Sequence, residues 1–281
     1  MGQSGGREKI HKLVMRKSSA EMVENMNIVI ITGASSGIGR EFALQMDDYF
    51  ENIDEFWLVA RNRDRLNSVA GKLRHNARIF ALDMTDGRKL EDLEEALFRH
   101  RAVVRMLINC AGYGIMGDFG GQDAGLELGM VRLNCEALTD MTRRVIPYMR
   151  QGSRIIQMAS SAAFLPQPGF AVYAATKAYV LYFSRALGEE LKESGIYVTS
   201  VCPGPVDTPF FDIAEATGST LAVKKYAMVS PEKVVRLALK DSYYMRPVSV
   251  CGFVMKAFRG LTKAVPHGLL LKAVDRMKRK G

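Results

Sequence analysis

The sequence predicts an α/β protein with one doubly wound domain around a seven-stranded parallel sheet. Short apolar runs alternate with helical segments along most of the 281 residues, which is typical of βαβ units. Runs such as IVIIT and RIIQMA are almost continuously apolar, as strands are when helices cover both faces of a parallel sheet. With 48% hydrophobic and 25% charged residues, the chain has the composition of a globular protein that buries a full core.

Seven apolar runs provide the predicted strands, and the periodic stretches between them provide helices. The strands are expected at residues 27–31, 55–60, 78–82, 106–109, 154–159, 197–202 and 247–250. The main helices are expected at residues 38–46, 87–100, 127–149, 173–194 and 231–242. Residues 207–230 are rich in small residues and follow the carboxyl end of a strand, where a substrate lid is expected.

The net charge of +9 is concentrated at the two ends of the chain. Residues 252–281 hold eight Lys or Arg and one acid, a net charge of +7, and residues 1–26 hold five against three, a net charge of +2. Residues 27–251 are therefore neutral, which argues against a nucleic-acid-binding body. We divide the chain into an N-terminal extension, 1–26, a main domain, 27–251, and a basic amphipathic C-terminal segment, 252–281.

The four cysteines predict neither disulfides nor a metal site. Cys110, Cys135, Cys202 and Cys251 are widely spaced, without a CxxC motif or a Cys/His cluster. A reduced compartment, the cytoplasm, is the simple interpretation. No apolar run is long enough for a membrane-spanning helix.

A glycine-rich turn, TGASSGIG at residues 32–39, follows the first predicted strand and opens a helix. Its glycines let the backbone turn tightly and approach a pyrophosphate, while the helix N-terminus offers free N–H groups. The spacing is G-x-x-x-G-x-G, and an ordinary glycine-rich βα turn is the alternative interpretation.

Further motifs follow this turn in order. They are Asp83 in LDMTD, NCAG at 109–112, Asn134 in RLN, Ser160 and Ser161 at a strand end, Tyr173 and Lys177 in YAATK, and PGPVDT at 203–208. Together they resemble the short-chain dehydrogenase/reductase family, especially its hydroxysteroid dehydrogenases and 3-oxoacyl reductases. The resemblance covers about residues 27–251, with Cys110 in place of a family Asn. It implies a Rossmann-type, dinucleotide-binding catalytic domain, and we expect a homo-oligomer.

Cofactor contacts are expected from the glycine-rich turn, the ends of later strands and the YAATK helix. The expected residues are Gly33, Ser35, Ser36, Gly37, Ile38, Gly39, Arg61, Asp83, Met84, Asn109, Ala111, Gly112, Tyr173, Lys177, Pro203, Val206 and Thr208.

The end of the second strand indicates NADP(H) as the cofactor. NAD-binding proteins of this architecture place an acid there to bond the ribose 2′-hydroxyl. This chain has Arg61 instead, whose guanidinium can pair with a 2′-phosphate. A solvated loop cation is the alternative.

Tyr173 and Lys177 are four residues apart in a helical stretch and so share one face. A ketone oxygen that gains a hydride also needs a proton, which a phenol can supply. A nearby ammonium is expected to lower the pKa of the phenol from about 10. The resemblance implies that Lys177 also bonds the nicotinamide ribose. Taken alone, this pair would be an ordinary surface or half-buried pair.

A serine hydroxyl is expected to hydrogen-bond the substrate oxygen. Ser160 stands 13 residues before Tyr173, the usual family count. The resemblance nevertheless favours Ser161, because in the family the second serine of such a pair at a strand end generally acts, and the loop before Leu165 would then be one residue shorter. The resemblance implies that Asn134 holds a helix irregularity and a water in a proton relay; a polar helix residue that bonds backbone is compatible with that role.

The loops expected at the substrate site are apolar, which favours a hydrophobic small-molecule substrate, although core packing explains them equally well. They carry Tyr113, Ile115, Met116, Phe164, Leu165, Pro166, Phe210 and Phe211.

The C-terminal segment interleaves apolar residues with cations, and Pro266 and Gly268 predict two short helices. It fits peripheral contact with an anionic membrane surface, or packing on the body or a second subunit.

The function we predict is NADP(H)-dependent interconversion of a ketone and a secondary alcohol on a hydroxysteroid- or 3-oxoacyl-type substrate. A non-catalytic NADP(H)-binding regulator and a membrane-surface adaptor are the alternatives.

Overall fold

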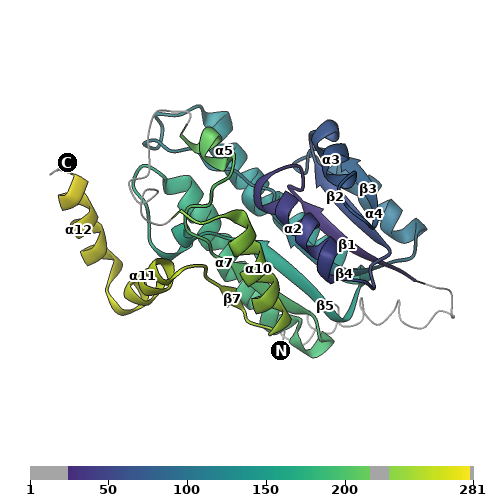
Figure 1. Cartoon of the computed structure of the whole chain (residues 1–281). Helices are drawn as coiled ribbons and strands as arrows, with labels where there is room; N and C mark the ends of the chain where they lie inside the picture. Colours follow the sequence, from purple (N-terminus) through teal and green to yellow (C-terminus); the bar gives the residue numbers. More distant parts are fainter. Residues whose placement is uncertain (1–24, 216–227, 279–281) are drawn as a thin grey trace, which may run out of the picture.

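A computed structural model describes residues 25–215 and 228–278 (Figure 1). Its centre is one seven-stranded sheet with the order β3-β2-β1-β4-β5-β6-β7, in which every pair is parallel. The strands are β1 Met26–Thr32, β2 Glu55–Ala60, β3 Asn76–Ala81, β4 Ala102–Asn109, β5 Met149–Met158, β6 Tyr197–Val201 and β7 Val248–Ser249. The predicted fold class is confirmed.

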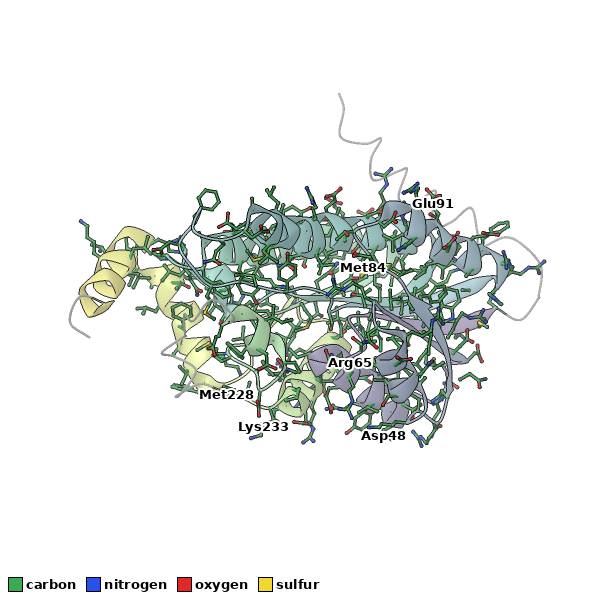
Figure 2. All side chains as sticks on the ribbon, turned by 90° about the horizontal axis from the view of Figure 1, so that it is seen from above. Asp48, Arg65, Met84, Glu91, Met228 and Lys233 are labelled. Carbon is green, nitrogen blue, oxygen red and sulfur yellow. The ribbon has the colours of Figure 1, made fainter. Side chains whose placement is uncertain are left out.

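Helices cover both faces of the sheet, and Figure 2 shows the two helix layers with the sheet between them. The helices are α2 Gly37–Tyr49, α3 Arg63–Ala70, α4 Gly87–Arg99, α5 Ala124–Val131, α6 Leu138–Val145, α7 Ala171–Glu190, α8 Phe210–Ala214, α10 Pro231–Tyr243, α11 Phe253–Ala264 and α12 His267–Lys278. One core cluster joins the sheet to α4, α6 and α7, and a second joins it to α2, α3 and α10. The near-continuous apolar strands follow from this cover.

The prediction of one continuous helix over residues 127–149 is wrong. The structure divides it into α5, a π-helix at Arg132–Ala137, α6 and a 3-10 turn at Ile146–Tyr148. Pro147 has no N–H for an α-helical bond, so the helix ends there and β5 begins at Met149, earlier than expected.

The carboxyl ends of the three central strands meet at one edge of the sheet. Thr32 of β1 pairs in register with Asn109 of β4, and Asn109 with Gln157 of β5. The strand order reverses between β1 and β4, which is where ligands bind in open α/β sheets. The glycine-rich turn, the NCAG motif and the two serines all leave the sheet at this edge.

The C-terminal segment forms the two predicted helices, α11 and α12, separated at Val265 and Pro266. No helix among residues 25–215 and 228–278 is long and apolar enough to cross a membrane. Most of the predicted N-terminal extension (1–24) and much of the predicted lid (216–227) lie outside the described residues.

Candidate active site

The turn between β1 and α2 requires glycine at each of its motif positions. Gly33 has φ +67°, and a Cβ there would lie 2.8 Å from the Ala111 nitrogen. Gly37 has φ +52°, and a Cβ on Gly39 would overlap with the Gly33 carbonyl. The N-cap residue Ser36 makes no side-chain bond to the first turn of α2. The N–H groups of that turn therefore have no side-chain cap and suit an anionic ligand.

The loops after β1, β4 and β6 border the same space. The Thr32 hydroxyl accepts hydrogen bonds from the Cys110 and Ala111 nitrogens, each at 3.1 Å. A Cβ on Gly37 would lie 3.3 Å from the Thr208 Cβ, so the PGPVDT loop touches the glycine-rich turn. The motifs that are far apart in the sequence therefore converge.

Arg61 lies exposed directly after β2, at the position that the sequence singled out. Its charge acts on Asp83 and on Tyr113. Burial tends to raise the pKa of Asp83, but hydrogen bonds from Thr85 and the charges of Arg61 and Lys89 hold that pKa below its usual range. An anionic Asp83 and a cationic Arg61 thus stand together at the β2–β3 end of the site.

Tyr173 and Lys177 are buried on one face of α7. The Lys177 Nζ donates to the Met158 carbonyl at 2.8 Å and lies 5.7 Å from the centre of the Tyr173 ring. Burial raises the pKa of Tyr173 to about 12 and lowers the pKa of Lys177 to about 8. The expected fall in the pKa of the phenol is wrong, because desolvation outweighs the lowering effect of the Ser160 hydrogen bond.

Ser160, not Ser161, is the serine whose side chain hydrogen-bonds Tyr173. Ser160 is extended and accepts from the Ala162 nitrogen at 3.1 Å, capping the 3-10 turn Ser161–Phe164. Ser161 begins that turn, and its backbone N–H donates to the Pro203 carbonyl at 2.8 Å. This contact favours Ser160 over the expected Ser161 as the serine beside Tyr173.

Asn134 lies in the π-helix and is completely buried. Its amide nitrogen donates to the Tyr113 carbonyl at 2.9 Å and to the Thr176 hydroxyl at 3.0 Å, and its oxygen accepts from the Tyr113 nitrogen at 3.1 Å. A Cβ on Gly112 would lie 2.8 Å from the Asn134 oxygen and 3.4 Å from the Lys177 Nζ. Because Gly112 has no Cβ, the side chains of Asn134 and Lys177 both have room beside it.

Two residues expected to bind the cofactor have side chains that serve the scaffold. The Asn109 amide donates to Thr142 and Gln157, both at 3.0 Å, in a buried polar cluster beneath the site. The Met84 side chain is buried in the core between the helix layers (Figure 2). Because both side chains are engaged in the scaffold, a cofactor contact of Asn109 or Met84 would come from the backbone.

Apolar side chains surround the Tyr173 ring. Phe170 stacks on it with centroids 4.2 Å apart, and Phe210 of α8 lies 5.5 Å away on a tilted ring. The cluster also includes Tyr113, Ile115, Met116, Met130, Val172 and Phe211. Phe164 is not part of it, because it packs against Phe258 of α11 instead.

The family model of the short chain dehydrogenases matches residues 27–217. The chain belongs to the short-chain dehydrogenase family. It is therefore an oxidoreductase of a family that uses a nicotinamide dinucleotide.

Relatives of this short-chain dehydrogenase extend along most of the chain. An uncharacterized oxidoreductase of Staphylococcus epidermidis is 32% identical over 184 residues, 65% of this chain and 79% of the relative. A short-chain dehydrogenase from Sphingobium yanoikuyae in complex with NADPH has a TM-score of 0.71 at 29% identity, covering 85% of this chain and 96% of its own. The bulky-bulky ketone specific alcohol dehydrogenase from Comamonas testosteroni has a TM-score of 0.67 at 27% identity, covering 86% and 96%.

The residues of this short-chain dehydrogenase fit a nicotinamide dinucleotide. The glycine-rich turn leaves a cradle that a Cβ would fill, beside a helix N-terminus without a side-chain cap. Ser35, Ser36 and Ile38 line the turn, and Pro203, Val206 and Thr208 lie in the loop that faces it.

Sequence reasoning missed two residues of the site. Phe170 precedes α7 and stacks on Tyr173, and Thr176 within YAATK holds Asn134. Thr176 lies three residues after Tyr173, a spacing that places both on one helix face and could have indicated its role. Nothing in the sequence marks Phe170 as a ring partner of Tyr173.

Proposed function

We propose that this short-chain dehydrogenase is an NADP(H)-dependent oxidoreductase that interconverts a ketone and a secondary alcohol on an apolar substrate. The observation that carries the proposal is the buried meeting of Tyr173, Lys177 and Ser160 beneath an aromatic cluster, at the edge of the sheet that holds the glycine-rich turn. A proton donor, a cation and a hydroxyl donor are what carbonyl reduction needs beside a hydride source.

When bound, the nicotinamide supplies or accepts the hydride. The Tyr173 hydroxyl donates its proton to the carbonyl oxygen in reduction and takes it back in oxidation. The Ser160 hydroxyl donates a hydrogen bond to the same oxygen as negative charge develops there. A pKa of about 12 keeps Tyr173 protonated at neutral pH, which is the form that can donate to a carbonyl oxygen.

Lys177 and Asn134 complete the arrangement. The Lys177 ammonium, held by the Met158 carbonyl, binds the nicotinamide ribose and stabilises negative charge beside Tyr173. Asn134 ties the π-helix to the Tyr113 backbone and to Thr176 of α7, and so positions the tyrosine helix. We also propose that Asn134 holds a water in a proton relay.

The choice of NADP(H) rests on Arg61. Its exposed guanidinium after β2 suits a 2′-phosphate. The solved relative from Sphingobium yanoikuyae, which carries NADPH, supports this choice.

The substrate is a lipophilic ketone or alcohol of the hydroxysteroid or 3-oxoacyl type. Phe170, Phe210 and Phe211 give the cluster around Tyr173 an apolar, aromatic surface that favours a bulky uncharged group beside the reacting carbon. The likeness to a bulky-bulky ketone specific enzyme agrees with this choice. We also propose that the protein works as a homo-oligomer.

A panel of steroids, acyl thioesters and simple ketones, followed by NADPH absorbance, tests the proposal. We expect turnover of at least one bulky apolar ketone and none of small charged ones. A protein that binds NADPH tightly but reduces no member of the panel would be the regulator instead, although the complete Tyr, Lys and Ser set argues against that role.

A further inference from the structure

Helix α11 has two apolar faces, and one of them is packed on the body. Met255 and Thr262 are buried, and the Phe258 ring lies 6.3 Å from the Phe164 ring. Met255 joins a core cluster with residues of α6, α7 and the 3-10 turn Ser161–Phe164, and it fits tightly over Gly204. This face fixes α11 against the loops at the carboxyl edge of the sheet.

The other face of α11 is exposed and apolar, and it continues onto α12. Phe253 is 85% exposed, Val254 52%, Leu261 47% and Leu269 58%; we call these four residues the tail surface. At helical spacing, Phe253 lies opposite Met255, and Val254 and Leu261 lie between Phe253 and the packed face. Single exposed apolar residues are common, but four of them on two adjacent short helices indicate a surface that binds a membrane or another protein.

Exposed lysines accompany the tail surface. Lys256 and Lys263 lie on the same side of α11 as Phe253, and Lys272 lies on α12. The segment 252–281 carries a net charge of +7 while residues 27–251 are neutral. Apolar side chains bordered by cations fit the interface of an anionic bilayer, where the apolar groups enter the acyl boundary and the lysines meet phosphates.

Charge argues against a second copy of the chain as the partner that covers the tail surface. A two-fold contact through the tail surface would bring the same lysines of two protomers together, and like charges across an interface are unfavourable. An anionic lipid surface neutralises them instead.

We propose that α11 and α12 form a peripheral binding surface for anionic lipid bilayers. Figures 1 and 2 both show α12 standing off the body at one end of the molecule, free to approach a flat surface. Because α11 packs on the 3-10 turn that Ser160 caps, binding would bring the carboxyl edge of the sheet close to the lipid. The proposal does not depend on which substrate is reduced.

Vesicle flotation of the full chain tests it. The probes are vesicles of phosphatidylcholine alone and of phosphatidylcholine mixed with phosphatidylglycerol, at low salt and at about 0.15 M salt, where the Debye length is about 8 Å. We expect the protein to float only with the anionic vesicles, more at low salt. The double variant Lys256→Glu/Lys263→Glu should weaken partitioning by at least about fivefold for each lysine.

Two further variants separate the apolar contribution from general charge. Phe253→Ser removes an almost fully exposed ring, so it should weaken flotation without lowering the melting temperature. The matched control Lys72→Glu/Lys192→Glu makes the same charge change at exposed lysines outside the tail and should float like the parent. NADPH oxidation with a water-soluble ketone should be equal in all of them.

Three outcomes would overturn the proposal. The first is a parent protein that stays with the soluble fraction beside anionic vesicles at low salt. The second is a control variant that loses flotation as much as the tail variant, which would mean unspecific charge attraction. The third is sedimentation that reveals a dimer lost in Phe253→Ser, which would make a second copy the occupant.

Discussion

Tyr173 is surrounded by groups that affect its proton in opposite directions. Burial against Phe170 and Phe210 disfavours the phenolate, while the Ser160 hydroxyl favours it, and the pKa stays near 12. Burial also disfavours the charged form of Lys177, the ammonium, and so lowers its pKa. At the residue scale, therefore, the site is set by desolvation more than by the lysine–tyrosine pair.

We predict that Ser160→Ala lowers kcat by about a hundredfold or more, the usual effect of losing a donor to a developing oxyanion. Ser161→Ala should stay within a few-fold of the parent, since the backbone of Ser161, rather than its side chain, bonds the Pro203 carbonyl. Steady-state kinetics of the two variants decides the matter. A larger loss in Ser161→Ala would mean that the serine of the site was assigned incorrectly from the structure.

We predict that kcat/KM for NADPH falls as the pH rises through about 8. Lys177 is protonated below its pKa of about 8 and loses its charge above it, whereas Tyr173 keeps its proton up to about pH 12. The decline should therefore belong to Lys177, and Lys177→Arg should move it to higher pH because a guanidinium stays charged. An unchanged pH profile in Lys177→Arg would contradict this assignment.

The sequence located most of the site residues because short motifs carry their own local geometry. The glycines of the β1–α2 turn are required by their backbone angles and by contact with residues 110–111, which any such turn would need. The choice between Ser160 and Ser161 is hard to make from sequence, because it depends on where β5 ends and the 3-10 turn begins. That boundary is set by the Pro203 carbonyl, some 40 residues along the chain.

At the scale of elements, the π-helix Arg132–Ala137 is the feature on which the site depends most. It aims Asn134 at the Tyr113 backbone and at Thr176, and so links the loop after β4 to α7. π-helical segments are rare and often occur at functional sites. The apolar periodicity of residues 127–149 could not reveal it, because a single extra residue in a turn barely changes that pattern.

We predict that Gly112→Ala uncouples this link. The new Cβ would lie 2.8 Å from the Asn134 oxygen, so either that side chain or the loop must shift. We expect kcat to fall about fivefold to a hundredfold, the cost of roughly 1–3 kcal/mol of misplacement, while the fold remains. Gly260→Ala on α11, where a Cβ meets nothing within 4 Å, is the control and should keep full activity. Equal activity in both variants would remove Asn134 from the account.

The strands and the sheet order could be predicted further than the helix ends. The seven apolar runs follow from burial on both faces, which the sequence displays directly, and the doubly wound family fold agrees with the observed strand order. The packing of α11 could not be predicted, since its two apolar faces give the same pattern whether one or both are covered.

At the scale of the whole molecule, we propose that the choice between NADPH and NADH is made at the β2–β3 end of the sheet, where Arg61 lies. We predict that Arg61→Ala weakens NADPH binding by about tenfold to a hundredfold, the value of a charge-assisted hydrogen bond to phosphate, and leaves NADH binding nearly unchanged. Arg185→Ala, an exposed arginine of α7, is the control. Calorimetry that finds NADH bound more tightly than NADPH by the parent protein would refute the preference.

Transfer of deuterium from the reduced nicotinamide of labelled NADPH to a bulky apolar ketone tests the central claim most directly. The parent protein should form an alcohol that carries the deuterium on the former carbonyl carbon. Tyr173→Phe should bind NADPH almost as tightly but form no labelled alcohol, since it loses only the phenolic hydroxyl. Labelled alcohol formed by Tyr173→Phe at a rate near that of the parent would contradict the account.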